Sequence, residues 1–165
     1  MTRFEQLVWM AAVCALLLSG PPAVAQGKAK ELASTQTEQG VGKKEHRLVL
    51  QVNSNDPAMM NLALNNATNV EQYYKDLGEK VEIEIVTFGA GLHMLRDDTS
   101  PVKDRIKSIA EKTPSISFKA CGNTQENMSK AENKKIPLLA QATVVKSGVV
   151  RVMELQEQGW AYVRP

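Results

Sequence analysis

After residue 45, the pattern of hydrophobic and polar positions changes repeatedly between two periods. Short apolar or alternating stretches, typical of strands, are separated by stretches in which apolar residues recur every three or four positions, typical of helices. The predicted strands cover residues 46–52, 81–88, 116–121, 142–146 and 160–163. This order predicts βαβ units on a mostly parallel five-stranded sheet. We therefore expect a three-layer α/β/α sandwich of flavodoxin-like or Rossmann-like type, with sites beyond the carboxyl ends of the strands.

Four helical segments are predicted between these strands, each with its own start signal. The residues expected to cap or start them are Asp56 with Pro57, Ser100 with Pro101, Asn123 or Thr124, and Ser147. The third helix, over residues 124–132, has the weakest apolar pattern. Met60 and Met153 fall on apolar helix faces, so we expect them to pack in the core rather than bind a soft metal.

The amino-terminal residues have the features of a signal peptide. A polar start with Arg3 precedes an apolar run over residues 7–18, the helix breakers of residues 20–22, and the small residues 23–25. We expect cleavage after Ala25, export to the periplasm or beyond, and no membrane attachment afterwards. A retained anchor is disfavoured because a membrane helix needs about 20 apolar residues. Residues 26–45 are polar and predict a flexible leader, so the predicted domain covers residues 46–165.

Composition narrows the function further. The chain has 165 residues, enough for one domain, and 20 Lys and Arg against 18 Asp and Glu give a net charge of +2. Such a small charge disfavours a nucleic acid partner, which requires a basic surface. The chain contains no GxGxxG, GxxxxGK[ST], GxSxG or CxxC pattern, so the sequence predicts no nucleotide cofactor, and no metal site is expected.

Cys121 is the residue most suited to chemistry. It becomes the only cysteine once Cys14 leaves with the signal peptide, and it ends the third predicted strand, just before Gly122 and a helix. Amide N–H groups at the start of that helix would favour a thiolate. The alternative is a small buried hydrophobe, which is the more common state of a free cysteine.

Several other residues follow strand ends and could line the same site. His93 follows Gly89 and Gly91 after the second strand, and strand order permitting it could approach Cys121 as a base; alternatively, it is a surface hydrogen-bonding residue. Asn53, after the first strand, and Asn123 are further candidates, although asparagine is also common in turns and caps.

Residues 46–165 resemble the DsrE/DsrF-like sulfur-relay family, in particular its members with signal peptides. The segments that carry the resemblance are residues 53–57, 64–67 and 69, 86–93, 118–124, 147–149 and 155–165. The resemblance implies a flavodoxin-like parallel sheet, assembly into homo-oligomers (trimers or hexamers), and a cysteine that carries sulfur as a persulfide. Only the cysteine transfers as a functional residue, onto Cys121. The sulfur donor and acceptor are not implied.

Three functional hypotheses follow. The first is an exported, oligomeric DsrE-like protein that uses Cys121 for sulfur transfer or thiol redox chemistry. The second is a noncatalytic oligomeric module that binds a small ligand or a soft metal at the strand ends. The third is a structural domain in which the thiol of Cys121 is simply buried.

Overall fold

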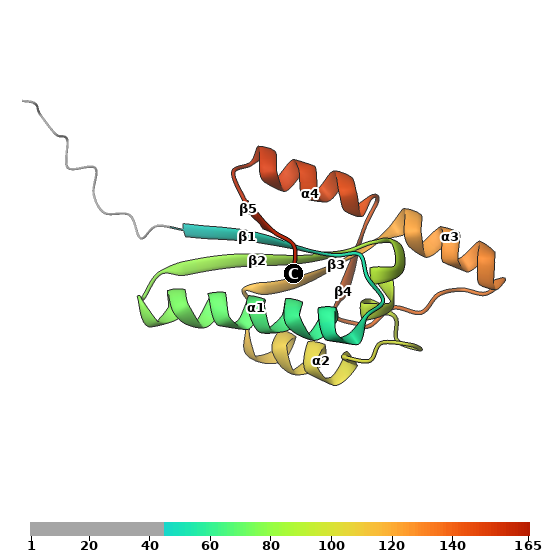
Figure 1. Ribbon diagram of the computed structural model, residues 1–165, viewed down its shortest axis with the longest axis horizontal. Helices are drawn as coiled ribbons and strands as arrows, with labels where there is room; N and C mark the ends of the chain where they lie inside the picture. Colours follow the sequence, from blue (N-terminus) through green and yellow to red (C-terminus); the bar gives the residue numbers. More distant parts are fainter. Residues whose placement is uncertain (1–44) are drawn as a thin grey trace, which may run out of the picture. The chain divides into compact units, whose positions relative to one another are not determined.

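The computed structural model describes residues 45–165 (Figure 1). The predicted signal peptide and all but the last residue of the predicted leader lie outside these residues. The sheet contains five strands, all parallel, in the order β4-β3-β2-β1-β5. The strands are β1 (Glu45–Val52), β2 (Lys80–Thr87), β3 (Ile116–Cys121), β4 (Ala142–Val145) and β5 (Ala161–Val163). The helices are α1 (Pro57–Asp76), the 3-10 helix η1 (Gly89–Leu95), α2 (Lys103–Lys112), α3 (Gly122–Glu132) and α4 (Gly148–Glu157).

The helices form layers on both faces of the sheet, which confirms the predicted α/β/α architecture. Helices α1 and α2 lie on one face and α4 lies on the other (Figure 1). Strands β1 to β4 are added one after another in the same direction, and the connection through α4 then returns the chain to the free side of β1, where β5 pairs. The reversal explains why α4 covers the opposite face, because parallel crossovers keep one hand. Within the described residues, no helix has the length and hydropathy that a membrane crossing requires.

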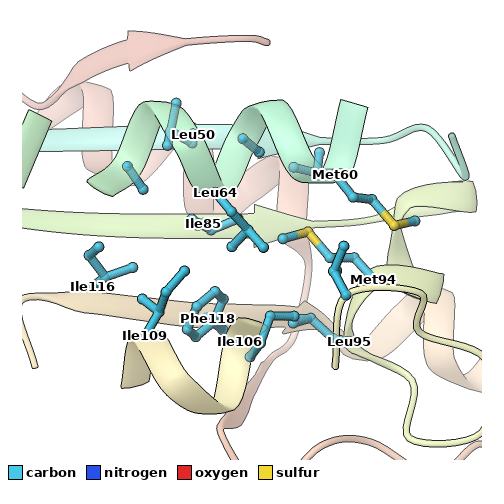
Figure 2. Close-up of a cluster of buried hydrophobic side chains, with 14 of the residues drawn as sticks. Leu50, Met60, Leu64, Ile85, Met94, Leu95, Ile106, Ile109, Ile116 and Phe118 are labelled. Carbon is cyan, nitrogen blue, oxygen red and sulfur yellow. The ribbon is translucent and has the colours of Figure 1, made fainter. Parts of the chain in front are cut away.

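The larger core lies between the sheet and the α1/α2 layer. Side chains of α1, α2 and η1 meet alternate residues of β1, β2 and β3 there (Figure 2). The central members are fully or almost fully buried; they are Leu50, Leu64, Ile85, Met94, Ile106 and Phe118. Alternation within the strands puts every second side chain on this face, as the sequence pattern predicts.

The smaller core lies beneath α4. Val49 and Val86 of the sheet pack against Val152 and Leu155 of the helix and against Trp160. Met60 is fully buried, as predicted, but the prediction for Met153 is wrong, because 53% of its surface is exposed. The helix buries the side of Val152 and Leu155, and Met153 points away from it.

The start signals of the helices are confirmed in part. Asp56 is the N-cap of α1 and its carboxylate accepts a hydrogen bond of 2.8 Å from the N–H of Ala58. Helix α2 begins later than predicted, at Lys103. Ser100 Oγ accepts from the N–H of Val102 at 3.3 Å and donates to the carbonyl of Met94 at 2.6 Å, so it orders the loop before the helix.

Candidate functional site

Cys121 is the last residue of β3 and the N-cap of α3. The sequence prediction of Asn123 or Thr124 as the cap is wrong, since α3 begins directly at Gly122. This places the Cys121 side chain beside the first turn of an 11-residue helix, where unpaired N–H groups give a positive local potential. Only 4% of the residue is exposed, so the thiol is nearly enclosed in the chain.

Four hydrogen-bond donors face the Cys121 sulfur. Burial raises the pKa of the thiol, but the Thr124 hydroxyl and the backbone N–H groups of Gly148, Thr124 and Asn123 outweigh burial, and the net pKa of Cys121 is lowered. The sulfur makes no close N-cap hydrogen bond, so these groups act on it as oriented dipoles. The Asn123 N–H lowers the pKa least of the four, and it also donates to the carbonyl of Lys146 at 3.2 Å. All four donors are uncharged, and they belong to the first turns of both α3 and α4.

Thr124 is oriented by η1. Its Oγ accepts a hydrogen bond of 3.1 Å from the N–H of Gly89, whose φ of +54° lies in the left-handed region. A hydroxyl has one proton to donate. Because Gly89 supplies a donor to the oxygen, the hydroxyl proton of Thr124 is free to point at Cys121.

Gly148 brings α4 into direct contact with the cysteine. A Cβ atom at this position would lie 2.9 Å from Cδ1 of Phe88 and 3.2 Å from Cβ of Cys121. A side chain would therefore push the first turn of α4 away from β3. Glycine allows the approach that brings its own N–H to the sulfur.

An open cleft of about 590 Å³ adjoins this arrangement. Its lining residues are Asn123, Val145, Lys146, Ser147, Val150, Arg151 and Glu154. The cleft lies where the chain leaves β3 for α3 and leaves β4 for α4, and divergence of two neighbouring connections is where α/β sheets commonly bind ligands. Cys121 does not line the cleft. Two residues close to it do: Asn123 in the first turn of α3 and Ser147, the N-cap of α4.

The structure brings together only some of the predicted site residues. Gly89 is linked to the cysteine site by its hydrogen bond to Thr124, and Asn123 lies in the first turn of α3, beside Cys121. His93 is not among the groups that act on the thiol; its Nδ1 lies 2.8 Å from Oγ1 of Thr99. Asn53 lines a separate, small cleft at the end of β1 with the carboxyl-terminal residues, and Gly91 packs directly on the backbone of Val52 and Asn53.

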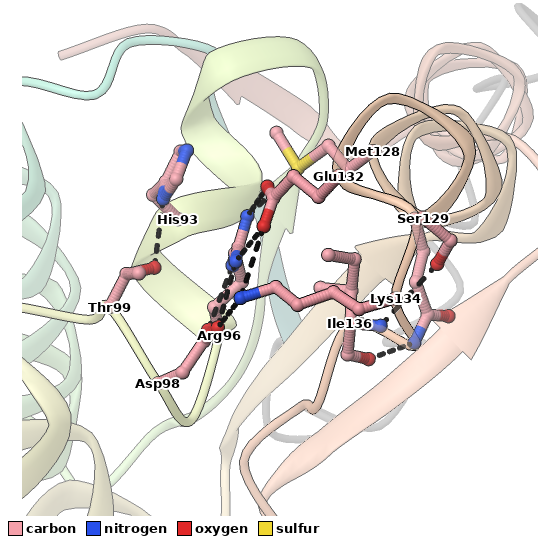
Figure 3. A network of polar contacts seen from close by, with 10 residues as sticks. His93, Arg96, Asp98, Thr99, Met128, Ser129, Glu132, Lys134 and Ile136 are labelled. Carbon is pink, nitrogen blue, oxygen red and sulfur yellow. Dashed lines mark hydrogen bonds and ion pairs between the residues drawn. The ribbon is translucent and has the colours of Figure 1, made fainter.

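Arg96 connects η1 to α3 in a network of charged groups (Figure 3). Its guanidinium is 1% exposed, and it donates to Asp98 at 2.8 and 2.9 Å and to both carboxylate oxygens of Glu132. Lys134 also reaches Asp98, at 3.0 Å. These bonds raise the pKa of Arg96 and lower the pKa of Asp98 and Glu132. The network holds the helix that carries Thr124 against the helix that carries Gly89.

Sequence reasoning missed the contribution of α4. Ser147 is the N-cap of α4, as predicted, although its side chain makes no capping hydrogen bond, and the residue that contacts Cys121 is the next one, Gly148. Helix α4 also carries Arg151, which pairs with Glu84 of β2, a carboxylate that is only 3% exposed. Within residues 45–165, no group of three or more His, Cys, Asp or Glu side chains is placed to hold a metal ion.

Comparison with known proteins gives a fold relative without an assigned activity. The chain is similar to the solved structure of MTH1491, a protein of unknown function from Methanobacterium thermoautotrophicum, with 30% sequence identity and a TM-score of 0.62. The match covers 73% of this chain and 99% of that chain. No family model matches the chain. No curated protein matches it either.

Proposed function

Starting from membership of the same family as MTH1491, a protein of unknown function, we propose that this chain carries sulfur as a persulfide, or exchanges thiols, on Cys121. The observation that supports the proposal is the set of uncharged donors around the sulfur, contributed by the first turns of two helices and by the Thr124 hydroxyl. Such donors favour an anionic sulfur, and the thiolate is the nucleophile in sulfur chemistry.

The reaction needs no cofactor. The Cys121 thiolate attacks the outer sulfur of a donor persulfide, R–S–S⁻, so that the S–S bond of the donor breaks and R–S⁻ leaves. Cys121 then carries the outer sulfur as its own persulfide anion. An acceptor thiolate removes that sulfur in the same way and returns the Cys121 thiolate. The oriented N–H groups that favour the thiolate also favour the persulfide anion, which places its charge one atom further out.

Burial of Cys121 bears on both steps. With 4% of the residue exposed, contact with bulk solvent is restricted, which slows unselective oxidation of the thiol. The adjoining cleft is lined by Asn123 and Ser147, which lie next to Cys121 and next to Gly148 in the two helix starts. We therefore propose that donor and acceptor approach from the cleft.

The proposal is tested by treating the purified protein with inorganic polysulfide at neutral pH and measuring its intact mass. We expect addition of one sulfur atom, located on Cys121 by peptide mapping and removed by a small thiol. The Cys121→Ser variant is the control and should stay unmodified. An unmodified wild-type protein, under conditions in which a free cysteine peptide reacts, would contradict the proposal.

The resemblance to DsrE-like proteins extends the proposal to export and assembly. We propose that the chain acts in the periplasm after removal of residues 1–25, as a homo-oligomer. Apolar side chains on the outer side of α4 support assembly, since Val149 and Met153 are each 53% exposed and Val150 is 46% exposed. Mass analysis of the amino terminus of the protein recovered from a periplasmic extract checks the predicted cleavage.

A second candidate function is supported by the size of the cleft. A hollow of about 590 Å³ could hold a small ligand without using the thiol, as expected of a noncatalytic binding module. In that case a native protein would react slowly with thiol reagents. The Cys121→Ser variant would retain the melting temperature of the wild type and any ligand-induced increase in it.

A further inference from the structure

An ion pair with a buried carboxylate joins α4 to the centre of the sheet. Glu84 lies on β2, between Val49 of β1 and Ser117 of β3, and its side chain is 4% exposed. Arg151 of α4 reaches both carboxylate oxygens, with Nε at 2.9 Å from one and Nη2 at 2.6 Å from the other. The carboxylate therefore accepts two charge-assisted hydrogen bonds from one planar group, an arrangement with defined geometry.

Stability alone gives little reason for this pair. Burying the Glu84 carboxylate costs free energy that its attraction to the partly exposed Arg151 offsets, and an apolar pair of similar volume is often equally stable or more stable. The same helix already packs Val152 and Leu155 on Val49 and Val86. An additional apolar contact would have continued that core. The ion pair instead determines the position of α4 on the sheet, because a bidentate contact has a defined geometry.

The helix position that the pair fixes is the one that contacts Cys121. Arg151 follows Gly148 by three residues and therefore lies on the same side of α4, about one turn away. The first turn of α4 is tightly packed there, since a Cβ atom on Gly148 would lie only 3.2 Å from Cβ of Cys121. A small movement of this turn would withdraw the Gly148 N–H from the sulfur.

We propose that Glu84 and Arg151 are a positioning pair, which holds the first turn of α4 against Cys121 so that the Gly148 N–H faces the sulfur. The inference rests on the proposed function, because a reactive thiolate is what this geometry serves. The charged groups around the pair are Glu82 of β2 and Glu154 of α4, whereas the groups that face Cys121 are uncharged. The pair therefore acts on the thiol through the position of α4.

The test is the pH dependence of Cys121 alkylation in a variant that replaces the pair by apolar residues, Glu84→Leu with Arg151→Leu. This variant should fold, because no buried charge is left alone. We expect its alkylation midpoint to move to higher pH and its rate at pH 7 to fall several-fold, with an unchanged far-UV circular dichroism spectrum. The control is Glu157→Gln, which removes an exposed carboxylate at the end of α4 that does not line the cleft, and it should leave the profile unchanged.

A second variant keeps the proposal testable if the double variant does not fold. Arg151→Lys retains the charge but replaces the planar two-point contact by a single ammonium, so we expect a midpoint between those of the wild type and a free cysteine. A folded double variant or Arg151→Lys variant with the wild-type midpoint would overturn the positioning role and leave the proposed function intact. A wild-type midpoint no lower than that of a free cysteine, together with no sulfur adduct, would instead overturn the proposed function.

Discussion

The Thr124 hydroxyl links two segments that lie 35 residues apart in the chain. It accepts from the Gly89 N–H and directs its own proton at Cys121, so one small side chain transmits the position of η1 to the thiol. Because the other donors are backbone groups, Thr124 is the donor that a substitution can remove without changing the fold.

We predict that Thr124→Val slows alkylation of Cys121 at pH 7. A hydrogen bond to a charged group contributes about 1.5 kcal/mol or more, so the rate should fall roughly tenfold and the alkylation midpoint should move to higher pH. Thr124→Ser is the matched control, since it keeps the hydroxyl, and it should retain most of the rate. Equal rates for Val and Ser at this position would show that the hydroxyl does not act on the thiol.

Gly148 provides a second prediction for a single residue. Gly148→Ala introduces a methyl group that would lie 2.9 Å from Phe88 and 3.2 Å from Cys121, so the first turn of α4 must move. We expect a loss of about 1–3 kcal/mol in the free energy of unfolding, typical of overpacking, together with slower alkylation at pH 7. Chemical denaturation and thiol labelling measure the two effects.

An exposed residue of α1, on the other face of the sheet, serves as the control for this substitution. Leu62→Ala changes a side chain that is 41% exposed, so both measurements should stay close to wild type. A stable Gly148→Ala protein with wild-type reactivity would contradict the tight approach of α4 to Cys121.

Among the elements, α3 depends most on the charged network around Arg96. Helix α3 contains no buried residue, so it has little apolar surface to hold it in place. Arg96 directly follows η1. Its guanidinium binds the carboxylate of Asp98, before α2, and that of Glu132, at the end of α3. The attachment of α3, and with it the position of Thr124, should therefore depend on pH.

We predict that the protein loses stability in acid through this network. Arg96 lowers the pKa of Glu132 from its usual value near 4.5 to about 2 and lowers the pKa of Asp98 further. A carboxylate with a lowered pKa contributes stability above its unfolded pKa, and that stability is lost as pH falls towards the folded pKa. Denaturation curves between pH 5 and pH 2 should show a declining free energy of unfolding.

The Arg96→Met variant should have a lower melting temperature at pH 7 and a weaker dependence on pH in the same interval. Lys103→Met removes an exposed pair with Asp97, in which both side chains are at least 44% exposed, and should change little. The same acid profile in wild type and Arg96→Met would exclude this network as the source of the pH dependence.

The elements themselves were predictable to different degrees. Helix α1 was predicted well because its start signals, Asp56 and Pro57, are local in sequence. The start of α3 was misplaced because Asn123 and Thr124 are good caps by residue type, whereas the pairing of β3 extends to Cys121 and leaves Gly122 as the first helical residue. Met153 was misplaced because α4 is apolar on more than one side.

At the scale of the whole molecule, the site of Cys121 depends on its contact with α4, which the order of elements along the chain does not reveal. Cys121 lies close to Gly148 because β4 pairs with β3, and the chain then reverses to reach β5. Cysteine at a strand end could be predicted from the pattern. The contact of Cys121 with α4, and the ion pair between Glu84 and Arg151 beneath that helix, could be predicted only from the order of the strands.

The exposed side of α4 supports a final prediction, which concerns assembly. Val149, Val150 and Met153 leave apolar surface exposed beside the cleft, and exposed apolar surface of this kind is typical of protein interfaces. We expect the purified protein to be a homo-oligomer at micromolar concentration, measured by light scattering after size-exclusion chromatography. Val149→Glu with Met153→Glu should dissociate it, because a second copy would have to bury four carboxylates for each pair of subunits.

The control places a single negative charge on the opposite face of the sheet. Leu62→Glu alters an exposed apolar residue of α1, 41% accessible, and should leave the oligomer intact. If the α4 variant dissociates and its Cys121 reacts faster with a bulky thiol reagent, the second copy also restricts access to the cleft. A wild-type protein that is monomeric at high micromolar concentration would contradict assembly through α4, and the cleft would then be open to a partner in the free chain.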